Sequence, residues 1–380
     1  MSLRINLYGN VCNNAYMVAK FLRRAGVDAH LYLEWNFPNR PEDDEPELKG
    51  RYPDWIHPTM DVRWLRYGFF DGAFTRQLGR CDLIHTFYYG PIWARKSGRP
   101  FVFQTYGGDL NVLPFMTDSL HHRYLAFRQR RGIRAANLVL LTNPTSQFCR
   151  EALRRLQLTR TTYLPLPIDA ERLSPMSEPE VQAMRRRYAC DWIFFHPARQ
   201  IWTESSYVWE RKGNDRLFRA FARFLQTTRR NALLIAVKHG PDLDASQRLV
   251  HELGLARWVR WIPRQTRHEL IRWYNLSDAV LDQFLLGDYG GCAFEAWSCG
   301  KPVFLHLNSF SAFGQEDPPA VNVQTEQEIY DQLVTLTDSP DDLRQLGRKA
   351  REWVLKYQHG DALVGRYLAC YRQILNGQMQ

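Results

Sequence analysis

The 380-residue sequence contains no long apolar run and no pairing pattern among its cysteines. No stretch reaches the roughly 18 apolar residues that a membrane helix needs, and the N-terminus has no charged segment followed by an apolar one. We therefore expect neither a membrane span nor a signal peptide. The seven cysteines are scattered, with no C-x-x-C pair, which is typical of reduced thiols in a cytoplasmic protein.

Several cofactor and catalytic motifs are also missing. No His/Cys cluster has zinc spacing, and neither a G-x-S-x-G elbow nor a P-loop occurs. The turn Tyr8–Asn14 is not a G-x-G-x-x-G fingerprint, which argues against a simple NAD enzyme. Asp242-Leu243-Asp244 has the D-x-D pattern of some metal sites, but it directly precedes a predicted helix, so we interpret it as a helix cap. We predict no metal and no cofactor.

The composition indicates a globular chain with a strong positive charge. Hydrophobic residues make up 45% and charged residues 24%, and the length allows two domains of ordinary size. The net charge of +10 favours anionic partners such as nucleotide phosphates, nucleic acid or an acidic membrane surface. A solvated basic face explains it equally well. No nucleic-acid module is recognisable, so we expect no specific nucleic-acid partner. Peripheral contact with an anionic membrane is a further expectation, and the positive charge is its only support.

The sequence alternates short apolar segments with helical patterns, which predicts right-handed βαβ units and parallel sheets. Strand-like segments are 3–8, 29–33, 83–87, 101–105, 138–142 and 162–164, then 192–196, 232–237, 259–261, 279–283 and 302–306. The pattern breaks near 166–190. The last predicted helices are 328–335, 340–357 and 361–375.

This alternation predicts an α/β protein of two Rossmann-like domains. The first is residues 1–168 and the second residues 169–357, with a helix in 358–380 that packs back on the first domain. Open α/β sheets bind ligands beyond the carboxyl ends of their strands, so two facing domains predict a central cleft.

The segment from Asp288 to Val303 is the strongest local signal for a binding site. It lies between two predicted strands and opens a helix. Gly290 and Gly291 let backbone N–H groups approach an anion, and a helix N-terminus adds positive potential that suits a diphosphate. Glu295, about one turn into the helix, can accept hydrogen bonds from two ribose hydroxyls. An ordinary strand-to-helix turn fits the same spacing.

Residues Glu295–Val303 (EAWSCGKPV) resemble the signature of retaining glycosyltransferase family 4, which has the GT-B fold. That signature is a Glu, seven residues, a second Glu and then Ala-x-x-Cys/Ser-Gly-x-Pro-Val. The resemblance extends over most of the chain and is strongest from about residue 190 to 306. It implies a GT-B protein that transfers a hexose-like sugar, with retention, from a nucleotide-diphosphate sugar. The implied acceptor is a glycan, a lipid-linked saccharide or a small molecule.

The resemblance also assigns roles in the second domain. Arg199 and Lys212 correspond to the cations that hold the donor diphosphate, and fixed cations of this kind make a divalent metal unnecessary. The first signature Glu falls at Gly287, which has no side chain, and the adjacent Asp288 offers a shorter carboxylate. In the family that Glu contacts the transferred sugar, so the donor sugar and catalytic competence stay open.

In the first domain, the resemblance places Gly9, Asn13 and Asn14 near the donor sugar and acceptor, although helix capping is our first interpretation of Asn13. A His-Gly-x-Asp-like turn has Tyr106 in the place of His, followed by Asp109. His85 is either a cleft residue or a core histidine.

The predicted site residues form three groups. They are Asp109, Asp288 and Tyr106 for catalysis; Arg199, Lys212, Gly290, Gly291, Glu295 and Gly9 for the donor; and Asn13, Asn14 and His85 on the acceptor side. The irregular stretch 36–61, with five prolines, is expected beside the acceptor, and the insert 201–210 is expected to cover a ligand.

Three other functions are consistent with the same fold. A nucleotide-sugar epimerase would alter the donor without an acceptor. A phosphorylase would need a lysine for pyridoxal phosphate, for which no specific signal exists. A catalytically degenerate protein would only bind sugars, nucleic acid or a partner enzyme, and Gly287 and Tyr106 favour that alternative.

Overall fold

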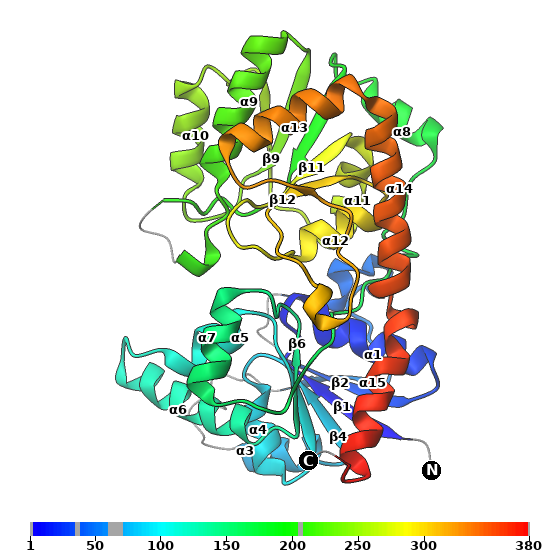
Figure 1. Cartoon of the computed structure of the whole chain (residues 1–380). Coiled ribbons are helices and arrows are strands. Elements are labelled where there is room, and N and C mark those ends of the chain that lie inside the picture. Colours follow the sequence, from blue (N-terminus) through cyan, green and yellow to red (C-terminus); the bar gives the residue numbers. More distant parts are fainter. Residues whose placement is uncertain (1–2, 35–38, 60–70, 204–207, 379–380) are drawn as a thin grey trace. The chain divides into compact units, whose positions relative to one another are not determined.

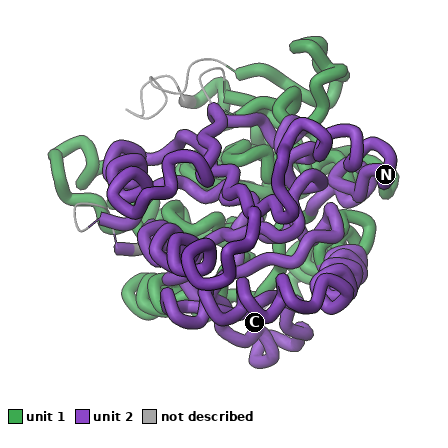
Figure 2. The backbone as a smooth tube through the Cα atoms, turned by 90° about the horizontal axis from the view of Figure 1, so that it is seen from above, with its two compact units in different colours: residues 1–167, 358–380 green, residues 168–357 purple. Residues whose placement is uncertain are grey.

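The computed structural model describes residues 3–34, 39–59, 71–203 and 208–378. The chain divides into two compact units, distinguished by colour in Figure 2. The N-terminal unit comprises residues 1–167 and 358–380, and the C-terminal unit comprises residues 168–357. Each unit contains one parallel sheet flanked by helices (Figure 1), which confirms the predicted α/β class with two Rossmann-like domains.

The N-terminal unit contains a seven-stranded sheet of order β3-β2-β1-β4-β5-β6-β7, in which all neighbours are parallel. The strands are β1 (Arg4–Tyr8), β2 (Asp28–Glu34), β3 (Ile56–Thr59), β4 (Leu83–Thr86), β5 (Phe101–Gln104), β6 (Leu138–Leu141) and β7 (Thr161–Tyr163). Strand β1 pairs with β2 through Leu7 and Leu31 and with β4 through Leu7 and His85. The chain therefore winds outward in both directions from β1.

Helices cover both faces of this sheet. They are α1 (Asn14–Arg24), α3 (Asp71–Leu78), α4 (Gly90–Ser97), α5 (Gly108–Asn111), α6 (Leu120–Arg134), α7 (Gln147–Leu156) and α15 (Gly360–Leu375). Because side chains alternate along a strand, neighbouring residues enter different cores. Leu7 packs in the core that contains α1 and α15, whereas Tyr8 packs in the core that contains α4 and α6.

Helix α15, the last element of the chain, belongs to the N-terminal unit. Leu363, Tyr367 and Tyr371 are spaced by four residues and form one buried face against α1. The Tyr367 hydroxyl lies 3.0 Å from Gln104 Oε1 and 3.1 Å from the Pro165 carbonyl oxygen. Polar as well as apolar contacts therefore fix α15 on this sheet.

The C-terminal unit contains a six-stranded sheet of order β10-β9-β8-β11-β12-β13, again parallel throughout. The strands are β8 (Trp192–His196), β9 (Ala232–Val237), β10 (Val259–Ile262), β11 (Ala279–Leu281), β12 (Val303–Leu305) and β13 (Val321–Asn322). The helices are α8 (Glu178–Arg185), α9 (Asn214–Thr228), α10 (Leu243–Glu252), α11 (Arg267–Leu276), α12 (Gly291–Ser298), α13 (Glu326–Asp338) and α14 (Pro340–Tyr357). One core joins β8, β9 and β11 to α9 and α13.

Two edge strands are absent from the sequence prediction. Strand β3 falls inside the stretch 36–61 that was predicted to be irregular, and its Pro58 explains the miss, because proline is tolerated only where a ladder hydrogen bond is not needed, as at a sheet edge. Strand β13 has only two residues. The described part of the stretch also holds the short 3-10 turns Pro41–Asp43 and Pro46–Leu48. Residues 36–38, 60 and 61 of that stretch, and 204–207 of the insert, lie outside the described residues.

No helix within the described ranges is both long and apolar enough to span a bilayer. All seven cysteines are free thiols.

Candidate functional site

The candidate residues follow the strands at which each sheet reverses its order. Strand β8 lies between β9 and β11. The loop after β8 contains Arg199, and the loop after β11 consists of residues 282–290. Strand β1 lies between β2 and β4, and the turn after it contains Gly9. Open α/β sheets bind ligands at such points because the two loops diverge to opposite faces. Each unit is described by itself below.

Asn214, the first residue of α9, organises the loop after β8. Its side-chain amide donates to Nε2 of His196 at 2.8 Å and to the Arg199 carbonyl at 3.1 Å, and its Oδ1 accepts from the Ile201 amide at 3.0 Å. Nδ1 of His196 donates to the Leu281 carbonyl at 2.5 Å. The fully buried imidazole thereby links β8, α9 and β11 in its neutral form.

Burial lowers the pKa of His196 from 6.5 to about 4, against a smaller opposing effect of the Leu281 carbonyl. Because the folded-state pKa lies below the unfolded one, His196 stabilises the fold above about pH 6.5 and this stability is lost as the pH falls toward 4. We expect the stability advantage of wild type over His196→Gln to shrink by ~2 kcal/mol between pH 7 and pH 5. Urea unfolding at the two pH values measures it.

Replacement of the exposed His251 of α10 by Gln is the control, since both the folded and the unfolded chain leave that ring in water. An advantage of wild type over His196→Gln that is the same at both pH values would contradict the prediction.

Positive charge gathers around the loop after β8. Burial lowers the pKa of His239, and the guanidinium groups of Arg264 and Arg199 lower it further. Arg199 is exposed and lies 3.5 Å from the carboxylate of Glu210, a long contact that leaves its guanidinium open to an anion. The sequence comparison predicted Arg199 but gave no reason to consider Arg264.

Lys212 extends this positive region toward α12. Its backbone bridges two loops, because its amide donates to the Ile201 carbonyl at 2.7 Å and its carbonyl accepts from the Phe284 amide at 2.8 Å. Burial raises the pKa of Asp282, and the Lys212 ammonium partly opposes that rise. Burial also raises the pKa of the Cys292 thiol, with Asp282 and Glu295 adding to the rise and Lys212 opposing it. Lys212 is thus electrostatically coupled to the first turn of α12.

The loop between β11 and α12 is held by Gln283. Its Oε1 accepts from the amides of Leu285 at 3.1 Å and Leu286 at 2.8 Å, and its Nε2 donates to the carbonyls of Asp288 and His306. Asp288 is buried, and its carboxylate accepts from the neighbouring Tyr289 amide at 2.8 Å. The carboxylate predicted to act on the sugar therefore binds its own loop.

Gly287 has a left-handed φ of +69°, and a Cβ there would lie 2.3 Å from Nδ2 of Asn308. The Asn308 amide donates to the Gly287 carbonyl at 3.0 Å, and its side chain is exposed. A side chain at position 287 would therefore have to displace the exposed Asn308 carboxamide and adopt a left-handed backbone conformation.

Helix α12 begins in the geometry expected of an anion site. Gly290 precedes it with extended backbone, no described side chain caps it, and a Cβ built at Gly290 would meet no described atom within 4 Å. The first amides of an α-helix have no partner within the helix, and the dipole makes this end positive. Gly291 is the first helical residue, so both predicted glycines lie at this open end.

Glu295 lies one turn further in and is 4% exposed. Its Oε1 accepts from Nε of Arg267 at 2.7 Å, and its Oε2 accepts from the Tyr274 hydroxyl at 2.8 Å. Both partners come from α11. These two hydrogen bonds fix the orientation of the carboxylate against α11.

We expect Glu295→Ala to destabilise the C-terminal unit by ~3 kcal/mol, because it leaves the Arg267 guanidinium and the Tyr274 hydroxyl without their acceptor. Glu295→Gln should cost less, since the amide oxygen still accepts one bond. Chemical denaturation measures both.

Glu316 provides a matched control, because its exposed carboxylate binds Lys356 at 3.2 Å and the Tyr357 hydroxyl at 3.0 Å. Glu316→Ala should leave stability within experimental error, since exposed ion pairs contribute little. Equal effects of the two alanine variants would contradict the structural role of Glu295.

In the N-terminal unit, the turn after β1 depends on Gly9. Its φ is +95°, and a Cβ there would lie 2.3 Å from the Phe87 carbonyl oxygen. The turn after β1 and the end of β4 therefore touch through backbone atoms. No other amino acid fits this position without moving the chain.

The cap of α1 differs from the prediction. Asn13 precedes the helix but makes no side-chain cap bond, and the Oδ1 of Asn10 accepts from the Tyr16 amide instead, at 2.9 Å. Asn13 has φ +57°, which turns its side chain toward the segment 40–44, where Nδ2 donates to Asp44 Oδ2 at 2.6 Å. Asn14 is buried as the first helical residue. The capping interpretation of Asn13 was wrong.

Asp109 holds the turn after β5. Its Oδ1 accepts from the amides of Tyr106 at 2.8 Å and Gly107 at 2.9 Å, and its Oδ2 accepts from the Tyr88 amide at 3.3 Å. Burial raises its pKa to about 6, although these backbone hydrogen bonds oppose the rise. Tyr106 is 41% exposed, and its hydroxyl lies 2.8 Å from Sγ of Cys12. Asp109 thus positions Tyr106, which faces solvent.

His85 lies in the core and not on a surface open to an acceptor. It is fully buried, its Nδ1 lies 2.6 Å from the Tyr371 hydroxyl of α15, and its ring stacks on Phe87 at 4.8 Å. Burial lowers its pKa to about 3, so the ring is neutral at ordinary pH. The acceptor-side prediction for His85 is corrected, because packing by α15 covers this end of β4.

Two acidic groups are structural. Asp242 does not cap α10 as predicted; its carboxylate accepts from the amides of Trp202 at 2.7 Å and Thr203 at 3.0 Å and so fixes the beginning of the insert.

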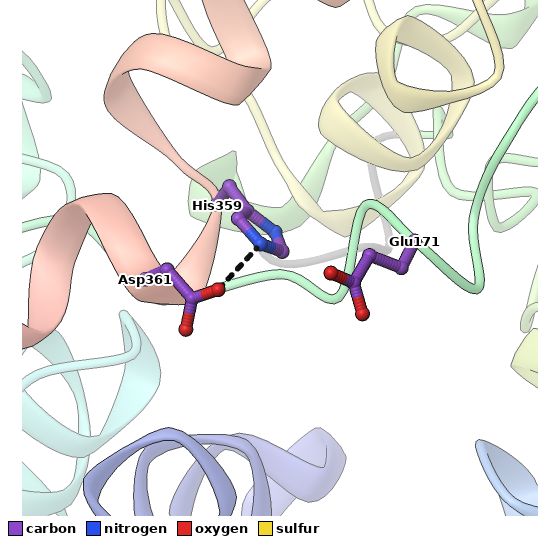
Figure 3. Close-up of side chains that lie close together, drawn as sticks. All are labelled: Glu171, His359 and Asp361. Carbon is purple, nitrogen blue, oxygen red and sulfur yellow. Dashed lines mark ion pairs between the residues drawn. The ribbon is translucent and has the colours of Figure 1, made fainter. Parts of the chain in front are cut away.

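In the N-terminal unit, His359 and Asp361 form an ion pair with 3.3 Å between Nε2 and Oδ2 (Figure 3). Glu171, also drawn there, belongs to the other unit, and we assign no metal site to these side chains.

Sequence reasoning missed the residues that support the site from a distance. These are Asn214, Arg264, Arg267, Tyr274 and Asp282. Their partners are distant in the sequence. Only Asn214 is near a predicted residue, because it follows Lys212 by two positions, and this closeness to Lys212 was the one signal in the sequence.

Two family models match this chain. Residues 13–172 match Glycosyltransferase Family 4, and residues 205–312 match Glycosyl transferases group 1. Together the two matches extend over more than half of the chain. The chain therefore belongs to the glycosyltransferases of family 4, which confirms the resemblance seen in the sequence.

Among curated proteins, the D-inositol 3-phosphate glycosyltransferase of Frankia alni is 37% identical over 100 residues, which are 24% of this chain and 25% of that protein. The protein of the same name from Corynebacterium jeikeium is 32% identical over 98 residues, which are 24% of this chain and 23% of its own length. The match spans about a quarter of these curated relatives.

Among solved structures, sucrose-phosphate synthase from Thermosynechococcus elongatus has a TM-score of 0.69 at 17% identity and covers 99% of this chain and 100% of its own. Anabaena Alr3699/HepE in complex with UDP and glucose has a TM-score of 0.71 at 15% identity and covers 98% and 100%. These likenesses establish the GT-B fold.

Proposed function

We propose that this protein transfers a hexose-like sugar from a nucleotide-diphosphate sugar to a hydroxyl acceptor, with retention of configuration and without a divalent metal. The observation that supports this best is the open, uncapped N-terminus of α12 beside Gly290, with Lys212 electrostatically coupled to Cys292 in its first turn. Backbone amides and a cation at one place fit a diphosphate, whose negative charge grows as its bond to the sugar breaks.

The other residues near α12 and the loop after β8 have supporting roles in binding the donor. Arg199 and Arg264 add positive charge beside the loop after β8. Glu295, fixed by Arg267 and Tyr274, would accept from the ribose hydroxyls. Fixed cations of this kind would perform the charge neutralisation that a metal performs elsewhere.

In the proposed reaction, the bond between the sugar C1 and the diphosphate oxygen breaks, and its electron pair stays on the diphosphate. The acceptor oxygen bonds to C1 on the same face, and its proton moves to the departing phosphate. This step needs no protein nucleophile. It agrees with the C-terminal unit, where the carboxylate of Asp288 accepts from a backbone amide of its own loop.

The similar proteins suggest which donors to test first. Anabaena HepE was solved with UDP, with UDP and glucose, and with UDP-glucose, and the curated relatives are D-inositol 3-phosphate glycosyltransferases. We therefore propose a UDP-sugar as the first candidate donor and a small phosphorylated polyol or a glycan as the first class of acceptor.

Calorimetric titration of the full chain with UDP, GDP and ADP, and with their sugars, tests the donor site. We expect one nucleotide series to bind in the presence of EDTA, and the anomeric configuration of the product, read by NMR, to equal that of the donor. Failure of every nucleotide to bind the folded protein would refute the donor site. Binding that requires Mg²⁺ would refute metal independence alone.

A nucleotide-sugar-binding protein without transferase activity is the second candidate. The observation that favours it is Gly287 itself, which has no side chain and a left-handed φ of +69° that disfavours one. Incubation with donor alone separates the candidates. An epimerase releases an altered nucleotide sugar, a transferase hydrolyses the donor slowly, and a binding protein leaves it intact.

A further inference from the structure

Helix α6 of the N-terminal unit presents a solvent face that combines large apolar side chains with arginines. Its exposed residues recur at intervals of three and four and therefore form one stripe. They are Leu120, Arg123, Tyr124, Phe127, Arg131 and Arg134. The opposite face, which includes Leu125 and Ala126, is buried in the unit.

The apolar half of this stripe is unusually exposed for large side chains. Leu120 is 83% exposed, and Tyr124 and Phe127 are each 47% exposed. Single exposed apolar residues are common on proteins, but three on adjacent turns of one helix form a patch. Such patches mark surfaces that contact a partner or a membrane.

The basic half determines which partner fits. Helix α6 contains five arginines and no acidic residue, and its first turn has no carboxylate. The guanidinium of Arg128 lies 5.6 Å from the ring centroid of Tyr124, and that of Arg131 lies 5.5 Å from that of Phe127. Cation–π contacts at these distances hold the rings beside positive charge. Three of the five arginines, Arg123, Arg131 and Arg134, are exposed, whereas Arg128 is buried. One carboxylate, that of Asp118 just before the helix, pairs with His122. The patch therefore combines three large apolar side chains with three exposed cations.

We propose that this face of α6 docks on an anionic membrane surface. Leucine and aromatic side chains partition into the headgroup region, while arginines bind lipid phosphates, so the helix would lie in the plane of the interface. A second copy of the chain fits the face poorly, because a twofold contact would oppose arginine to arginine. The proposal does not depend on the reaction proposed above.

The test is co-sedimentation of the full chain with vesicles of phosphatidylcholine alone and of phosphatidylcholine mixed with phosphatidylglycerol, at low and high salt. We expect binding to the mixed vesicles that weakens as salt rises. Arg123→Gln with Arg131→Gln should lower the partition coefficient about 30-fold. Tyr124→Ser with Phe127→Ser should also weaken binding, including the part that resists salt.

Two matched variants control for charge and apolarity elsewhere. The first variant replaces Arg219 and Arg248 by Gln, which removes the same amount of charge. Both arginines are exposed on helices of the C-terminal unit. The second variant replaces Leu355 and Leu375 by Ser. Both leucines are exposed, so this variant removes apolar surface outside α6. Both control variants should bind the mixed vesicles as wild type does.

Three results would overturn the proposal. The first is no binding of wild type to mixed vesicles at low salt. The second is equal loss in the α6 variants and their controls, which would mean that net charge alone acts. The third is a different partner. In that case wild type would not bind vesicles but would self-associate, seen by light scattering, or bind RNA, and the α6 variants would lose that self-association or RNA binding.

Discussion

Replacement of Lys212 by alanine is expected to lower the kcat/KM of sugar transfer about 10²–10³-fold and to abolish measurable binding of the nucleoside diphosphate. The ammonium group is coupled to the first turn of α12, where the amides at Gly290 and Gly291 form the open end of the helix. Without this cation, the charge that develops on the leaving diphosphate loses its fixed counter-charge. Steady-state kinetics and calorimetry measure the two effects.

Lys212 also faces the buried carboxyl of Asp282, so its loss can disturb the fold as well as the site. Lys212→Met combined with Asp282→Asn removes both charges and should restore stability while diphosphate affinity stays low. Lys349→Ala, an exposed position on α14, is the matched control and should retain wild-type kinetics. Full diphosphate affinity in the double variant would refute the assigned role of Lys212.

Replacement of Gly9 by alanine is expected to destabilise the N-terminal unit by more than ~3 kcal/mol or to prevent soluble expression. The added Cβ would lie 2.3 Å from the Phe87 carbonyl oxygen, and φ is +95°, so both sterics and backbone conformation oppose it. Because the obstacle is backbone and not a flexible side chain, β1 and β4 would have to separate.

The control for this variant is Gly98→Ala at the end of α4. Gly98 also has a positive φ, +71°, but a Cβ there meets no described atom within 4 Å. It should therefore cost only the conformational penalty of ~1 kcal/mol. Thermal and urea unfolding compare the two variants, and similar losses would show that the contact with Phe87 is not decisive.

Much of the architecture could be predicted because its signals are local. Apolar segments such as Leu138–Leu141 and Ala232–Val237 are bounded by turn residues, and all eleven predicted strand segments overlap strands of the two sheets. The missed strands are the ones with weak local signals, β3 with Pro58 and the two-residue β13.

The candidate site could be predicted only in part. Gly290, Gly291 and Glu295 are close in sequence, and their spacing already indicates a strand, a turn and a helix start. The partners of Glu295 are 28 and 21 residues away on α11, and no periodicity connects them. Likewise, Asn10 and not Asn13 caps α1, because the left-handed backbone at Cys12 and Asn13 turns the second side chain away.

The sequence by itself determined the alternation of strands and helices, the positive charge and the family signature, because periodicity, glycine and composition act over a few neighbouring residues. Only the tertiary structure decided which side chains meet and which face of α6 stays in water. Hydrogen bonds, pKa shifts and burial arise between residues that are far apart in the chain. Asp109 illustrates the difference: its place in a turn was visible in the sequence, but its bonds to three backbone amides exist only once the chain has folded.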